Sequence, residues 1–149
     1  RLSGSLVEML GRNLTAAGIQ STYLEGEFAR IKDKHVDFSH IDTDKDAILL
    51  VLFNRTGFVS ASVLDAPFEP WVAVNLRLMK GSTKEILMET VYSAGHGKDS
   101  PDGSVFVPCA ENHRFATFAK VLEDFPRSIE SLTLCEEAMA KRIAADLKP

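Results

Sequence analysis

One cysteine and one histidine lie close enough in the sequence to act together as a nucleophile and a base. Cys109 and His113 are four residues apart at the start of an expected helix, and a helix N-terminus lowers the pKa of a thiol. A small enzyme that uses these two residues is therefore one hypothesis. The sequence offers no third residue to orient the imidazole, and it has no Gly-x-Ser-x-Gly turn to carry a hydrolase serine. We therefore assign no catalytic residue.

Two groups of residues have side chains that could bind a metal ion, but their spacing in the sequence does not match that of a metal site. Residues 42–46 resemble the opening of a calcium loop, but Ala47 stands where the sharp turn needs glycine. Phe53 stands where a bidentate glutamate is required. His35 and His40 would reach Asp42 only if the loop folded back on itself. We therefore predict no metal site.

Residues 95–100 combine glycines with a lysine, which are the residue types of a phosphate-binding loop. Such a loop needs four residues between its glycines and a Ser or Thr directly after the lysine, followed by a helix. Here Asp99 follows Lys98, and the sequence Pro-Asp-Gly at residues 101–103 predicts another turn. We interpret residues 95–103 as a polar connection, and we predict no cofactor.

An aromatic pair in a proline-containing segment is the candidate for a partner-binding surface. Phe68 and Trp71 lie in residues 67–71, whose two prolines cannot donate hydrogen bonds to a sheet, so we expect a linker there. Aromatic side chains dominate the energetics of protein interfaces. They also commonly cover the edge of a core, so docking and packing remain alternatives for this pair.

Three helices are expected from apolar residues that recur at three- and four-residue steps. The first covers residues 2–17 and ends before Gly18, since glycine takes the left-handed cap conformation easily. The second covers residues 113–123, is capped by Asn112, and directs four side chains inward: Phe115, Phe118, Val121 and Leu122. The third covers residues 126–147 and carries one apolar stripe: Ile129, Leu132, Cys135, Met139, Ile143 and Leu147.

The remaining apolar segments predict strands. Strands are expected at residues 19–24, 47–53, 71–80 and 86–93, with a continuation or a further strand over 58–64. Residues 25–46 are expected to be mostly loop, with a short strand or a turn around 28–31 and 36–38. Residues 47–53 are apolar at consecutive positions, which favours a central strand buried on both faces. Residues 71–80 alternate and turn back into residues 86–93, so these two form a hairpin.

Together these elements predict one α/β domain over residues 1–149, an α+β sandwich. Its sheet is mixed and mainly antiparallel, has four to five strands, and is covered on one face by the N-terminal and C-terminal helices. The chain has 149 residues, of which 45% are hydrophobic and 26% charged. Those proportions are typical of an ordinary globular domain and exclude collagen-like, coiled-coil and disordered classes.

The charge pattern excludes two classes of partner. Lys and Arg number 17 against 21 Asp and Glu, and both signs are spread along the chain. No basic stripe is present, so we expect no nucleic acid partner. The longest apolar run, residues 47–53, is far shorter than the roughly 20 residues of a membrane-spanning helix. The chain begins at Arg1, as an exported protein does after loss of its signal peptide and as an excised domain also does.

Cys109 and Cys135 are the two cysteines of the sequence. If they are paired, the crosslink stabilises the fold by about 3–4 kcal/mol in the chain-entropy description. The alternative is two unrelated thiols, one of them a small buried apolar residue. The residues alone leave both alternatives open.

Three stretches resemble the α/β domains of small bacterial envelope lipoproteins: ABC-transporter auxiliary lipoproteins, penicillin-binding-protein activators and the curli-secretion lipoprotein. Residues 6–19 are similar to the opening helix of these domains, which ends in a glycine before a strand. Residues 70–78 and 85–92 look like their paired middle strands. Residues 138–147 resemble their last helix.

The resemblance implies a non-catalytic, periplasmic, outer-membrane-associated module that binds or assembles envelope proteins. It also implies the soluble part of a lipoprotein, with a lipid anchor upstream of this chain and without a transmembrane span. Because that compartment is oxidising, the resemblance favours a disulfide between Cys109 and Cys135. The alternatives are a small-ligand binding module, with a pocket between sheet and helices, and the small enzyme based on Cys109 and His113.

Overall fold

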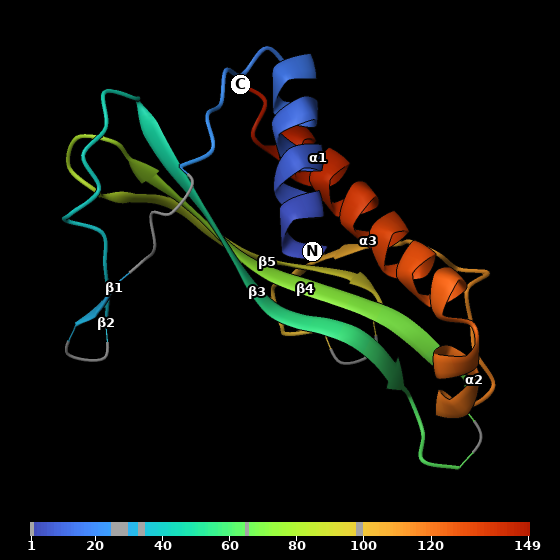
Figure 1. The fold of residues 1–149 in the computed structure, drawn as a ribbon. Helices are drawn as coiled ribbons and strands as arrows, with labels where there is room; N and C mark the ends of the chain where they lie inside the picture. Colours follow the sequence, from blue (N-terminus) through green and yellow to red (C-terminus); the bar gives the residue numbers. More distant parts are fainter. Residues whose placement is uncertain (1, 25–29, 33–34, 65, 98–99) are drawn as a thin grey trace.

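The computed structural model describes residues 2–24, 30–32, 35–64, 66–97 and 100–149. It has the predicted α+β architecture: a mixed, mainly antiparallel four-stranded sheet with helices from both ends of the chain on one face (Figure 1). The helices are α1 (Leu2–Ala16), α2 (Phe118–Glu123) and α3 (Phe125–Asp146). The strands are β1 (Arg30–Lys32), β2 (His35–Asp37), β3 (Ala47–Ser60), β4 (Phe68–Lys80), β5 (Ile86–Gly95) and β6 (Val105–Val107).

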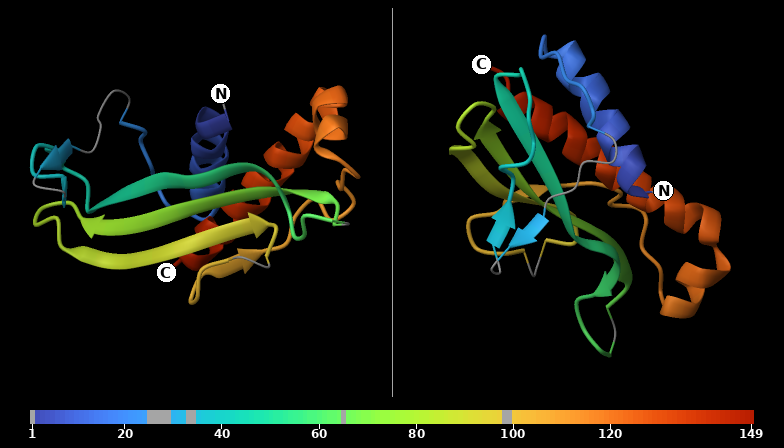
Figure 2. Two further views of the ribbon diagram at one scale, coloured as in Figure 1. Left: turned by 90° about the horizontal axis from the view of Figure 1, so that it is seen from below. Right: turned by 60° about the vertical axis from the view of Figure 1, so that its left-hand side comes forward.

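The main sheet has the strand order β3-β4-β5-β6. β3, β4 and β5 are antiparallel neighbours, which confirms the predicted hairpin, and β6 lies parallel to β5. β1 and β2 form a separate two-stranded hairpin, near the two expected short strands. Figure 2 shows the sheet from a second side, with β3 along one edge and β6 along the other.

The core fills the space between this sheet and the helices α1 and α3. Alternate residues of β4 (Val72, Val74 and Leu76) are fully buried, as the period of two in a strand requires. They pack in one cluster with apolar residues of both helices, among them Leu6, Leu10, Leu14, Met139 and Ile143. Burial of each such side chain stabilises the fold by roughly 1.5–3 kcal/mol. The hypothesis of a small-ligand binding module expects a pocket between the sheet and the helices, and this cluster occupies that space.

Two strand predictions are wrong. Residues 47–53 belong to an edge strand rather than a central one, since β4 is the strand that pairs with β3 in the described part of the chain. Residues 19–24 form no strand: Ile19 packs on the core, but the polar residues after it are exposed. The alternative that residues 58–64 continue the strand is correct only for residues 58–60, since β3 ends at Ser60; its register shifts between Phe53 and Arg55.

The segment that we expected to be a linker is the beginning of β4. Phe68 and Pro70 pair with residues of β3, and the Pro70 carbonyl accepts a hydrogen bond of 2.9 Å from the His96 amide. Proline fits here because only its carbonyl is used. The close contact also requires Gly95, whose φ is +88° and whose added Cβ would lie 2.0 Å from the Pro70 oxygen.

The second helix is shorter than predicted. α2 begins after Thr117, whose side chain accepts a hydrogen bond from the Lys120 amide, whereas residues 113–116 are not helical. Phe115 and Val121 are buried as expected. Phe118 and Leu122 are 52% and 61% exposed, so the prediction that they point inward is wrong. α1 and α3 agree with their predicted ranges within two residues.

A buried tyrosine joins β5 to the end of α3. Tyr92 is 1% exposed and donates a hydrogen bond of 3.0 Å to the Asp146 carboxylate. Burial, followed by this hydrogen bond, raises the pKa of Tyr92 to about 12. The phenol therefore remains protonated and remains a donor at any physiological pH.

Substitution Tyr92→Phe is expected to lower the free energy of unfolding by about 1–2 kcal/mol, because it removes a hydrogen bond to a charged group and keeps the ring. Urea denaturation measures the change. In a double-mutant cycle with Asp146→Asn, the two substitutions should cost less together than the sum of their separate effects. Simple additivity would show that the bond contributes nothing.

Within the described ranges, none of the helices combines the length and hydrophobicity that a membrane crossing requires.

Candidate functional site

The site is built around the segment between β6 and α2, residues 108–117, here called the β6–α2 loop. The Sγ atoms of Cys109 on this loop and Cys135 on α3 lie 1.95 Å apart, which is disulfide distance. Phe115 pairs with Phe68 at the start of β4 through two backbone hydrogen bonds of 2.7 and 3.0 Å. The Asn112 carbonyl accepts a hydrogen bond from Arg127 of α3. The loop is therefore fastened to the sheet and to α3.

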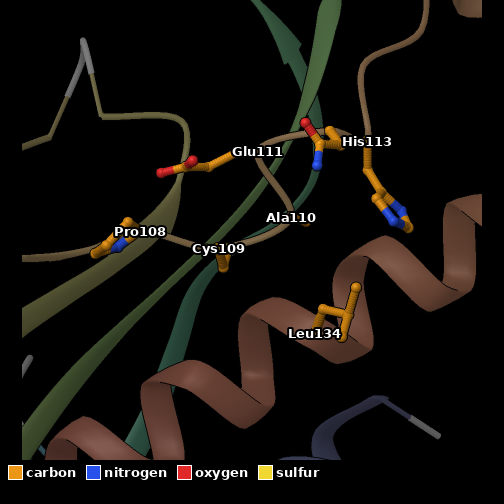
Figure 3. A pocket seen from close by; sticks show the side chains of 7 residues that line it. Pro108, Cys109, Ala110, Glu111, His113 and Leu134 are labelled. Atoms are coloured by element: carbon orange, nitrogen blue, oxygen red, sulfur yellow. The ribbon is translucent and has the colours of Figure 1, made fainter.

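Two open depressions flank Cys109 on the surface of this loop. The larger has a volume of about 470 Å³ and is lined by Pro108, Glu111, His113 and Leu134 among others (Figure 3). The other, of about 300 Å³, lies on the side of Gly95, Phe106 and Arg114. Both are shallow surface features, unlike the enclosed pockets that bury most of a small ligand.

Cys109 and His113 do not form a catalytic pair in the structure. Cys109 is bonded to Cys135, so it has no free thiol to ionise. The imidazole of His113 points toward α3 (Figure 3), where its Nδ1 lies 2.8 Å from the Ser131 hydroxyl. Ser131 donates its own proton to the Arg127 carbonyl, so His113 carries a proton on Nδ1. The enzyme hypothesis therefore loses its nucleophile in the oxidised protein.

A partly buried polar chain connects the loop to the sheet. Arg114 Nε forms an ion pair with Glu69 of β4 at 3.0 Å, and the other carboxylate oxygen of Glu69 lies 2.9 Å from His96 Nδ1. His96 is 1% exposed, so the expectation that it belongs to an open polar connection is wrong. The signal in the sequence for the burial of His96 was its position between Gly95 and Gly97. In the structure, an added Cβ at either glycine would clash with a neighbour.

Trp71 belongs to the packing alternative. Its side chain is largely buried and its Nε1 donates a hydrogen bond of 2.9 Å to the Ser93 hydroxyl. The Arg55 guanidinium lies 4.8 Å from the centre of the indole ring, and the His96 ring lies 5.7 Å away. Both flanking groups restrict access to the indole, so it presents no exposed anchor. These contacts favour packing for Trp71, and a partner surface that includes it stays a prediction.

Phe68, the other residue of the aromatic pair, leads to an apolar surface that sequence analysis missed. It is half-buried, and its ring centre lies 5.7 Å from that of Phe118 on α2. α2 and the connection from β3 to β4 lie at the same end of the molecule (Figures 1 and 2). The exposed apolar side chains of these two segments and of the start of α3 form what we call the apolar end surface: Val63, Leu64, Phe118, Leu122, Phe125 and Ile129.

The four helical members of the apolar end surface are between 36% and 63% exposed. Phe118 and Leu122 are four residues apart on α2, and Phe125 and Ile129 are four residues apart on α3, so each pair shares one helical face. The same spacing suggested a buried face in the sequence, because periodicity identifies an apolar stripe without identifying what covers it. An exposed apolar patch of this kind commonly marks an interaction site.

The metal-ligating candidates do not meet in the described part of the chain, and the phosphate-binding candidate lies partly outside it. No group of three His, Cys, Asp or Glu side chains converges there. Residues 42–46 form a surface turn before β3. His35 lies on β2, while Lys98 and Asp99 fall outside the described residues.

The chain was also compared with known proteins. No family model, curated protein or solved structure matches it. Its function is therefore argued from the loop and the surfaces described above.

One buried carboxyl lies away from this site. Glu136 on α3 has no exposed surface. Burial raises the pKa of Glu136 to about 7, and its contact with the Ser5 hydroxyl of α1 lowers this pKa only in part. The carboxyl therefore lies where α1 packs against α3 and changes charge near neutral pH.

Proposed function

We propose that this chain is a non-catalytic protein-binding module of the bacterial cell envelope, the soluble periplasmic part of an outer-membrane lipoprotein. The observation that carries the proposal is the apolar end surface. Its six exposed apolar side chains are enough to anchor a partner, and no other part of the described chain covers them. The partner is a protein that offers a complementary apolar helix or groove. Charged residues around the surface, such as Lys120 and Arg127, supply the polar rim of an interface.

Two further observations support the envelope location. The cysteines lie at disulfide distance, and disulfides persist in oxidising compartments such as the periplasm. The resemblance of three sequence stretches to envelope lipoprotein domains favours the same location. The lipid anchor and the outer-membrane association rest on that resemblance.

Photo-crosslinking in the native cell tests the proposal. A benzoylphenylalanine at position 122 should give one discrete crosslinked product in the envelope fraction. The matched control is position 87 on β5, where Leu87 is 54% exposed against 61% for Leu122. Position 87 lies outside the apolar end surface and should give no such product.

Substitution Phe125→Asp should reduce the crosslinked product from position 122 at least about tenfold, because a few anchor residues supply most of the binding energy of an interface. Circular dichroism should show an unchanged fold, since Phe125 is 63% exposed. Equal crosslinking from positions 122 and 87, or a product only in the cytoplasmic fraction, would contradict the proposal.

A further inference from the structure

The long edge strand β3 has an unusual combination of position and sequence. It runs for 14 residues along the edge of the sheet (Figure 2). Within the described chain, β4 is its one pairing strand, so its other side carries backbone N–H and C=O groups without a strand partner. Residues 47–53 are nevertheless apolar on both faces, a pattern typical of a strand with neighbours on both sides.

β3 also lacks the devices that usually protect an edge strand. Natural proteins place proline, lysine or a bulge on such strands, or make them very short. Residues 47–53 contain neither proline nor lysine, and the register shift of β3 comes only after Phe53. The opposite edge strand, β6, is only three residues long and so is protected by its length. The β3 edge therefore offers a second strand a much longer row of backbone groups than the β6 edge does.

We propose that β3 pairs antiparallel with β3 of a second copy of this chain, around a two-fold axis at Leu50. Seven residues of each strand, 47–53, would form the ladder over about 23 Å. The two four-stranded sheets would then form one continuous sheet, with the helices of both copies on the same face. This proposal does not depend on the apolar end surface, which lies near the other end of β3.

Self-complementarity identifies the second copy as the occupant. Antiparallel pairing about a two-fold axis places each apolar residue of 47–53 opposite another apolar residue of the same stretch. The charged residues outside this stretch, Lys45 and Arg55, come opposite each other at both ends of the ladder, so the apolar stretch rather than charge sets the register.

The unequal edges also favour a closed dimer over a chain of copies. A heterologous contact would join β3 of one copy to β6 of the next and would continue without closure. β6 offers only three residues for such a ladder, against seven in the symmetric pairing of residues 47–53. The symmetric contact covers the apolar part of the long edge, residues 47–53, in both copies.

Light scattering during size-exclusion chromatography, over a range of protein concentrations, tests the proposal. The whole chain should show a concentration-dependent monomer–dimer equilibrium. Leu52→Lys puts a charge on the strand at a side chain that is 38% exposed, and it should weaken dimerisation about 30-fold because symmetry introduces the lysine twice. Leu87→Lys, at an exposed position of β5, is the control and should leave dimerisation unchanged.

Hydrogen exchange of the unaltered protein gives a second readout that does not depend on a variant folding. Amides of residues 47–53 that point away from β4 should become protected as the concentration rises. A monomer at every concentration overturns the proposal. If these amides are protected in that monomer, a segment of the chain itself covers the edge; if they exchange freely, the edge awaits a different partner. A dimer that Leu52→Lys leaves intact also overturns it.

Discussion

Replacement of both Cys109 and Cys135 by alanine is expected to lower the free energy of unfolding by about 3–4 kcal/mol. The two residues are separated by 26 positions, so the crosslink restricts a long loop of the unfolded chain, and its removal restores that conformational entropy. In the folded protein the same crosslink holds the β6–α2 loop against α3. Urea denaturation followed by circular dichroism measures the loss.

Reduction provides the matched control for the cysteine substitutions. Dithiothreitol should destabilise the unaltered protein by a similar amount and should leave the double alanine variant unchanged. Alkylation before and after reduction should detect no free thiol in oxidised protein and two after reduction, in agreement with the pairing of both cysteines. A loss below about 1 kcal/mol would show that the loop is held mainly by its other contacts, such as the pairing of Phe115 with Phe68.

The fold could be predicted wherever local periodicity and tertiary packing agree. The alternating residues of β4 and the long stripe of α3 gave the correct elements, since each has one face in the core. Residues 47–53 were misplaced for the opposite reason. Consecutive apolar residues indicate that both faces avoid water, but they do not show whether the backbone of the strand has one neighbour or two.

The site was harder to predict, because its residues meet only through long-range contacts. Arg114, Glu69 and His96 are not neighbours in the sequence and form one polar chain in the fold. Phe118 and Leu122 have the spacing of buried residues, yet α2 begins only after Thr117 and turns them to the surface. Short-range patterns carry no information about either arrangement.

Glu136 is expected to make the protein less stable as the pH rises from about 4.5 to above 7. Burial raises the pKa of this carboxyl from 4.5 to about 7 in the folded state. Between these values the folded chain binds more protons than the unfolded chain, so the free energy of unfolding falls as the pH increases. The full change is about 3 kcal/mol, complete once the pH exceeds the folded-state pKa. Urea denaturation at pH 4.5, 6 and 8 measures it.

Substitution Glu136→Gln should abolish this dependence, because a neutral amide of similar shape cannot ionise between α1 and α3. The difference between the two proteins at each pH removes the contribution of the histidines, which both contain. Glu137→Gln is the matched control. Glu137 occupies the next position of α3 with its side chain 44% exposed, and a hydrogen bond from Lys141 lowers its pKa. Its loss should preserve the fall above pH 4.5. If Glu136→Gln falls as steeply as the unaltered protein, another group is responsible. If it does not, the ionisation of Glu136 within the α1–α3 contact weakens the native state at neutral pH.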